Sequence, residues 1–174
     1  MNFKKHTSVI TCAAIVLAGS VVMVSAEGAA NKQSPSSSAS DANARTIRGV
    51  WRTVVTPFNC DTGQPIVTLS GLFTFNRGGT MSEYGIGPGS SPALRSPGHG
   101  LWQREHGWRE YSFAFTFYRY NASGIHLGSQ RVTAALELDG NGNGFASRSR
   151  IEILDLSDNL VGRGCATTVG TRFE

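Results

Sequence analysis

Apolar and polar residues alternate along most of the chain from Gly49 onward, in short segments separated by turns rich in glycine, asparagine and proline. Alternation with a period of two is typical of strands that bury one face. No segment shows a convincing helical period. We predict strands at residues 49–58, 67–76, 80–84, 99–105, 108–120, 125–138, 145–156 and 160–173. This succession predicts an all-β fold, an eight-stranded antiparallel up-and-down β-barrel.

The inward face is clearest in residues 108–120, where every second position is aromatic. A barrel of eight strands can fill its interior with side chains or hold one small ligand. Small residues on the same faces, such as Gly71, Ser147 and Ser149, favour unfilled space, although a fully packed core stays open. The predicted inward-facing residues are Leu69, Phe73, Phe75, Tyr111, Phe113, Phe115, Phe117, Val132, Ala134, Leu136, Leu138, Phe145, Ile151 and Ile153.

The first 45 residues differ from the rest of the chain in composition. Lys4 and Lys5 precede an apolar run, Val9 to Val24, which ends in the small residues Ser25 and Ala26. This order predicts a signal peptide over residues 1–26, cleaved near Ala26, because the run is short for a membrane anchor. Residues 27–45 are rich in serine and are predicted to be a disordered linker. The β-barrel domain then covers residues 46–174.

Two cysteines, Cys60 and Cys165, remain after the predicted cleavage. An even pair in an exported protein predicts a disulfide, with two unpaired thiols as the alternative. Cys60 follows the first predicted strand and Cys165 lies in the last, so their pairing requires a closed sheet. We therefore expect a secreted or periplasmic protein.

The charge pattern excludes several classes of function. The formal charge of +4 falls to about +2 without Lys4 and Lys5, and the arginines are scattered along the strands. Nucleic-acid binding is therefore not expected.

The chain has no Gly-x-Ser-x-Gly motif, phosphate loop or Cys-x-x-Cys motif. The turn 139–144 resembles half of an EF-hand loop, but Arg150 occupies the position of its bidentate glutamate. We predict no cofactor, no metal site and no stable membrane span.

The first and last strands carry a resemblance to a known family. Gly49-Val50-Trp51 resembles the Gly-x-Trp of the first strand in lipocalin and calycin barrels, and the resemblance covers residues 46–174. It implies that Trp51 closes the floor of the barrel and that Arg172 packs on it. The chain differs from typical lipocalins in lacking a clear helix before the last segment and in placing its longest loop at 85–98. Both differences leave room for barrels like allene oxide cyclases and dirigent proteins.

Polar residues beside the long loop are the candidates for chemistry. His99 follows the loop, and an imidazole at a barrel mouth could transfer protons near neutral pH. Glu83 and Tyr84 end the third strand, and one of the two must point inward. A carboxyl group in an apolar barrel has a raised pKa and could also transfer protons. The alternatives are an exposed loop histidine and a solvated glutamate at the rim.

We interpret the chain as a binding protein for a small hydrophobic molecule held inside the barrel. The alternatives are an isomerase or cyclase of the same shape, and an exported module that acts through its rim loops. A charge-free apolar interior favours binding, an inward Glu83 or His99 favours the enzyme, and a filled core favours the module. The predicted ligand-binding residues are Phe73, Phe75, Tyr84, His99, Trp102, Phe113, Phe115 and Phe117.

Overall fold

The computed structural model describes residues 45–173 of the chain, so the predicted signal peptide and residues 27–44 of the predicted linker lie outside it. The elements are β1 (Gly49–Phe58), β2 (Leu69–Phe75), β3 (Thr80–Ile86), the 3-10 turn η1 (Pro92–Leu94), β4 (Gly98–His106), β5 (Glu110–Tyr120), β6 (His126–Leu138), β7 (Gly144–Leu154) and β8 (Leu160–Arg172). Each predicted strand begins and ends within two residues of the observed one. No helix within residues 45–173 is long and apolar enough to cross a membrane.

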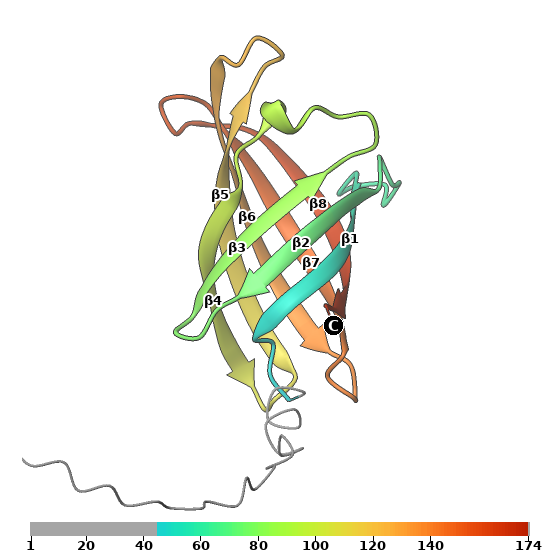
Figure 1. The fold of residues 1–174 in the computed structure, drawn as a ribbon. Coiled ribbons are helices and arrows are strands. Elements are labelled where there is room, and N and C mark those ends of the chain that lie inside the picture. Colours follow the sequence, from blue (N-terminus) through green and yellow to red (C-terminus); the bar gives the residue numbers. More distant parts are fainter. Residues whose placement is uncertain (1–44, 174) are drawn as a thin grey trace, which may run out of the picture. The chain divides into compact units, whose positions relative to one another are not determined.

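The strands form a closed barrel in chain order, as predicted (Figure 1). Every strand is antiparallel to its neighbours, and β1 closes the sheet against β8 with Trp51 opposite Arg172 and Phe58 opposite Cys165. Four loops, at 59–68, 87–97, 121–125 and 155–159, lie at one end of the barrel, the upper end in Figure 1. We call this the open end. The closed end holds residues 45–48 and the turns at 76–79, 107–109 and 139–143.

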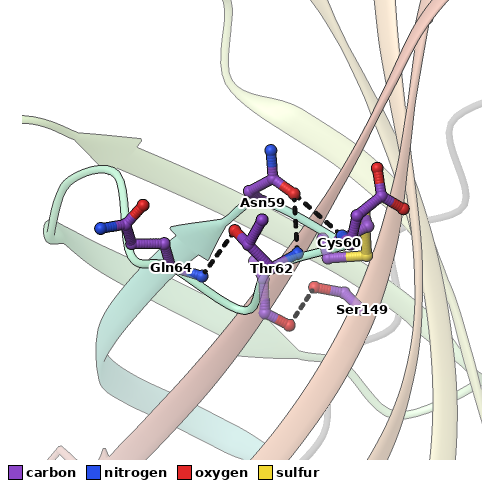
Figure 2. The surroundings of a disulfide bond; sticks show 8 residues. Asn59, Cys60, Thr62, Gln64 and Ser149 are labelled. Carbon is purple, nitrogen blue, oxygen red and sulfur yellow. Dashed lines mark hydrogen bonds between the residues drawn. A yellow bond between two sulfur atoms is a disulfide. The ribbon is translucent and has the colours of Figure 1, made fainter.

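Cys60 and Cys165 form a disulfide between the loop after β1 and strand β8, which confirms the predicted pairing. Their Cα atoms lie 5.3 Å apart, although 105 positions separate them in the chain. A cross-link over a loop of this length contributes about 4–5 kcal/mol if its effect is entropic. Figure 2 shows the neighbouring turn, where the side-chain oxygen of Asn59 accepts hydrogen bonds from the amides of Asp61 and Thr62. A disulfide of this kind is typical of proteins that fold in an oxidising compartment.

The predicted inward faces are buried. Aromatic and aliphatic residues of β2, β5, β6 and β7 form one continuous core, and Leu69, Ile151 and Ile153 are half-buried at its edge. The alternate positions of the same strands, such as Thr116 and Thr133, are exposed. Because the side chains of a strand alternate between its two faces, knowing which positions are buried tells which residues the barrel encloses. The fully buried large side chains are Ile47, Trp51, Phe75, Met81, Tyr111 and Leu138.

Trp51 closes one end of the barrel. Its ring is fully buried and meets Phe145 edge-on, with 5.0 Å between ring centroids. The indole N–H donates to the Ile47 carbonyl at 2.7 Å. Arg172 places its guanidinium 4.3 Å from the centre of the Trp51 ring, as the resemblance to lipocalin barrels implied. The same guanidinium donates hydrogen bonds to the carbonyls of Thr46, Arg48 and Gly142.

Candidate ligand-binding cavity

A cavity of about 540 Å³ occupies the open half of the barrel. This volume lies in the range of roughly 300–1,000 Å³ that small-molecule sites usually have. The cavity reaches from the ring of Phe113 up to the loops, where Ile66 and Leu94 lie at its mouth. Most of its lining is apolar. The strand residues that supply this apolar lining include Val55, Leu69, Phe73, Phe113, Phe115, Phe117, Val132, Ile151, Ile153 and Ala166.

The space exists because several inward residues of β7 and β8 are small. Ser149, Gly164, Ala166 and Thr168 line one wall of the cavity. Ser149 is buried and donates its hydroxyl to the Ala166 carbonyl at 3.2 Å, so this polar group is satisfied within the wall (Figure 2). These side chains are too short to reach the aromatic wall on β5. The interior therefore stays unfilled above the aromatic core.

One buried carboxylate faces the cavity. Glu83 points inward from β3, is only 4% exposed, and forms a bidentate ion pair with Arg95 from the loop before β4. Arg95 Nη1 lies 3.1 Å from Glu83 Oε1 and also donates to the Gly85 carbonyl at 3.3 Å. Gly98 leaves room for this carboxylate, because a Cβ atom there would lie 2.6 Å from Glu83 Oε2.

Burial and the ion pair with Arg95 act on the pKa of Glu83 in opposite directions. Burial raises the pKa of this carboxyl group above its ordinary value, because an apolar wall solvates the charge poorly. Arg95 lowers the pKa through its charge and its hydrogen bonds, but burial has the larger effect. Glu83 therefore accepts a proton at a higher pH than a glutamate in water.

Arg95 also links the long loop to the barrel. Its guanidinium lies 3.6 Å from the centre of the Phe117 ring, within range of a cation–π contact. The next residue, Ser96, donates its amide to the Tyr118 carbonyl at 3.0 Å, and its hydroxyl accepts from the Tyr118 amide at 2.9 Å. The second half of the loop is thus bound to the end of β5, at the mouth of the cavity.

The structure brings most of the predicted site residues together. Five of them point into the cavity, from β2, β3 and β5: Phe73, Glu83, Phe113, Phe115 and Phe117. Tyr84 borders the cavity from the outward-facing position next to Glu83, opposite the exposed Leu72. Phe75 and Trp102 pack against each other in the core instead, with ring centroids 6.3 Å apart, and lie outside the lining. Their height along the barrel depends on how far the strands are shifted against each other, which alternation alone does not show.

His99 does not lie where the sequence led us to expect. It is exposed on the outer face of β4, opposite Ser82 and Thr116, and is absent from the cavity lining. The inward positions next to it are Gly98 and Gly100, which carry no side chain to reveal the phase of the strand. The pairing with β3 decides that phase and turns His99 outward, away from the cavity.

The three arginines that line the cavity, Arg95, Arg119 and Arg163, were not predicted from the sequence. Arg119 extends the inward alternation of β5 two residues beyond Phe117, so the pattern that located the aromatic residues could have located it too. Arg95 lies in an irregular loop and reaches a partner 12 residues earlier in the chain. No local pattern indicates such a contact.

A comparison with protein-family models and with curated proteins finds no match for this chain. A proposal for its function therefore rests on the fold and the cavity. Together they define an up-and-down β-barrel with one end packed and the other hollow.

Proposed function

We propose that this protein is a secreted or periplasmic binding protein, lipocalin-like in shape, that holds one small, mainly apolar molecule in the open end of its barrel. The cavity of about 540 Å³ is the observation that carries the proposal. Its apolar walls would supply affinity, and the few polar groups near Glu83 and Tyr84 would orient the ligand. The loops at the mouth would control entry and release, since loops on a stable scaffold commonly do so.

The proposed compartment follows from two features of the chain. The Cys60–Cys165 disulfide supports an oxidising environment. The composition of residues 1–26 supports export through a cleaved signal peptide. An exported carrier would meet its ligand outside the reducing cytoplasm.

A second candidate function is an isomerase or cyclase that works in the same cavity. The inward carboxyl of Glu83, with its raised pKa, favours this candidate because it could exchange a proton with a bound molecule. Its ion pair with Arg95 favours the carrier, since both carboxylate oxygens already have a partner. The two functions share the cavity and differ in whether the ligand leaves unchanged.

The first experiment is native mass spectrometry of the protein purified from its own host. We expect one retained small molecule per barrel. Its chromatographic behaviour before and after prolonged incubation with fresh protein distinguishes a carrier from an isomerase, because isomerisation leaves the mass unchanged but alters retention. A protein that retains no molecule is then tested with N-phenyl-1-naphthylamine, an uncharged apolar probe that fluoresces in apolar sites.

The matched variants Val132→Trp and Thr133→Trp test whether the probe lies inside the barrel. Val132 lines the cavity, whereas the next residue on β6 is exposed on the outer face. The first change fills part of the cavity and should weaken binding roughly tenfold or more. The second should leave it unchanged. If the wild type retains no molecule and binds neither this probe nor a negatively charged analogue of it, the carrier and enzyme proposals both fail, and an interaction module acting through the rim loops is favoured.

A further inference from the structure

The charges that line the cavity do not balance. Its charged lining residues are one carboxylate, Glu83, and three guanidinium groups, from Arg95, Arg119 and Arg163. Glu83 and Arg95 neutralise each other. Arg163 is exposed at the rim, where water screens its charge. Arg119 is the half-buried cation, and no carboxylate among residues 45–173 lies within ion-pairing distance of it.

The hydrogen bonds of Arg119 are also incomplete. Its Nη2 reaches the carbonyls of Leu127 and Leu154, each at 3.4 Å, which is long for an N–H···O bond. Its Nε is buried and has no partner within the described part of the chain. Buried N–H groups without partners are rare in proteins, and each one costs stability. Arg119 therefore lines an apolar cavity with its charge unpaired and its hydrogen bonds incomplete.

We propose that the ligand is an amphipathic anion, with an apolar body and one acidic head group that the guanidinium of Arg119 binds. This inference rests on the proposed binding function and adds the chemical class of the ligand. A guanidinium pairs with a carboxylate or phosphate through two parallel hydrogen bonds, and it remains charged at any physiological pH. The apolar surroundings strengthen this attraction relative to water.

The positions of the residues also give the direction in which the ligand binds. Arg119 lies near the loop end of β5, next to the bulge at Tyr120, and its backbone bridges to Arg95 in the mouth loop. Phe113 lies six residues before Arg119 in β5, closer to the closed end, and contacts Phe73 there. The apolar body then enters first and rests on these rings, and the acidic head stays at the mouth beside Arg119.

A pair of probes that differ in one charge tests the inference. 1-Anilinonaphthalene-8-sulfonate carries a sulfonate on the same ring system as the uncharged N-phenyl-1-naphthylamine. We expect the wild type to prefer the sulfonate. Arg119→Gln should weaken sulfonate binding roughly ten- to a hundredfold, the effect of losing a hydrogen bond to a charged group, and should leave the uncharged probe unaffected. Arg119→Lys, which keeps the charge, should retain part of the preference.

The control variant is Arg131→Gln on the outer face of β6, where Arg131 faces Glu152 at 3.5 Å. It should not change the affinity for either probe. Uncharged-probe binding without any preference for the sulfonate overturns this inference and leaves the proposed binding function standing. If the wild type binds neither probe, the binding function itself is overturned. Equal losses for both probes in Arg119→Gln would show a structural role and also overturn the inference.

Displacement of N-phenyl-1-naphthylamine then identifies the head group. Dodecanoate, dodecyl phosphate and dodecan-1-ol share one chain and differ only in the head. If dodecanoate or dodecyl phosphate displaces the probe more strongly than dodecan-1-ol does, the result supports an acidic ligand. The stronger competitor of the two then shows which head group the site prefers. The inference would be overturned if dodecan-1-ol displaced the probe as strongly as dodecanoate and dodecyl phosphate do.

Discussion

The two ends of this barrel use the same kinds of residue to opposite effect. At the closed end, Arg172 covers Trp51 and donates hydrogen bonds to three backbone carbonyls, so each nitrogen of its guanidinium has a partner. At the open end, Arg119 has two long contacts and one buried N–H without a partner. An arginine whose donors are all engaged stabilises a fold. One with spare donors beside a cavity is suited to a ligand.

The apolar residues differ between the ends in the same way. At the closed end, aromatic rings from β2, β5 and β7 pack together above Trp51, and Phe73 and Phe75 both contact Phe145. Toward the mouth, the inward positions of β8 carry Gly164, Ala166 and Thr168, and space remains. The alternation of apolar and polar residues sets only which side chains face inward. Their sizes decide whether the interior is packed or hollow.

The largest effect is expected at the boundary between the two halves. Phe115 is 6% exposed and contacts Phe73 and Phe113. Phe115→Asp puts a charge without a partner into this apolar layer, at a cost of several kcal/mol against a total stability of about 5–15 kcal/mol, and should unfold the barrel. Thr116→Asp, on the outer face, should be tolerated. Similar thermal unfolding temperatures for the two variants would contradict the assignment of the faces.

Truncating one aromatic residue at each end compares packed and hollow regions directly. Trp51→Ala removes a fully buried ring and should cost about 3–5 kcal/mol. Phe117→Ala should cost about 1–2 kcal/mol less, because Phe117 borders an existing cavity and its removal creates less new empty surface. Urea denaturation measures both. Equal losses would mean that the open half is packed as tightly as the closed half.

Removal of the disulfide should affect the open end first. Replacing Cys60 and Cys165 together by serine should lower the free energy of unfolding by about 2–4 kcal/mol, because measured losses usually fall below the entropic value for a loop of this length. Amide hydrogen exchange should increase more in the loop 59–68 than around Trp51, because the cross-link ties that loop to β8. Reduction of the wild type serves as the control. Uniform acceleration along the chain would show that the disulfide acts on the whole barrel.

The smallest expected effect is a dependence on pH. Burial raises the pKa of Glu83, so its contribution to stability is fully present below the pKa of the unfolded chain and is lost as pH rises through the folded value. The stability of the wild type relative to Glu83→Gln should therefore fall as pH rises from about 3 to 7. Urea denaturation across this range measures the difference.

Glu105 gives the opposite case on the outer surface. Hydrogen bonds from Ser112 and Gln103 lower the pKa of this exposed carboxyl group. Its contribution is present above the unfolded pKa and is lost as pH falls through the folded value. The stability of the wild type relative to Glu105→Gln should rise with pH. The same sign in both comparisons would contradict the different environments of the two groups.

The sequence alone determined much of this protein. The strands, their inward faces and the disulfide were predicted correctly, and Arg172 contacts Trp51 as the resemblance of the first strand to lipocalin barrels implied. These features depend on local alternation, on an even pair of cysteines, or on a short motif. Local alternation survives in the fold because a slip of one residue would expose a whole row of aromatic rings to water.

Only the tertiary structure decided the composition of the site. It turned His99 outward, placed Phe75 in the packed core, and brought Arg95 from an irregular loop onto Glu83. The stagger between strands sets the height of each inward residue along the barrel, and a long arginine side chain can reach a partner that no local pattern indicates. A period of two shows that a residue points inward. What it meets there depends on pairing between strands that are distant in the chain.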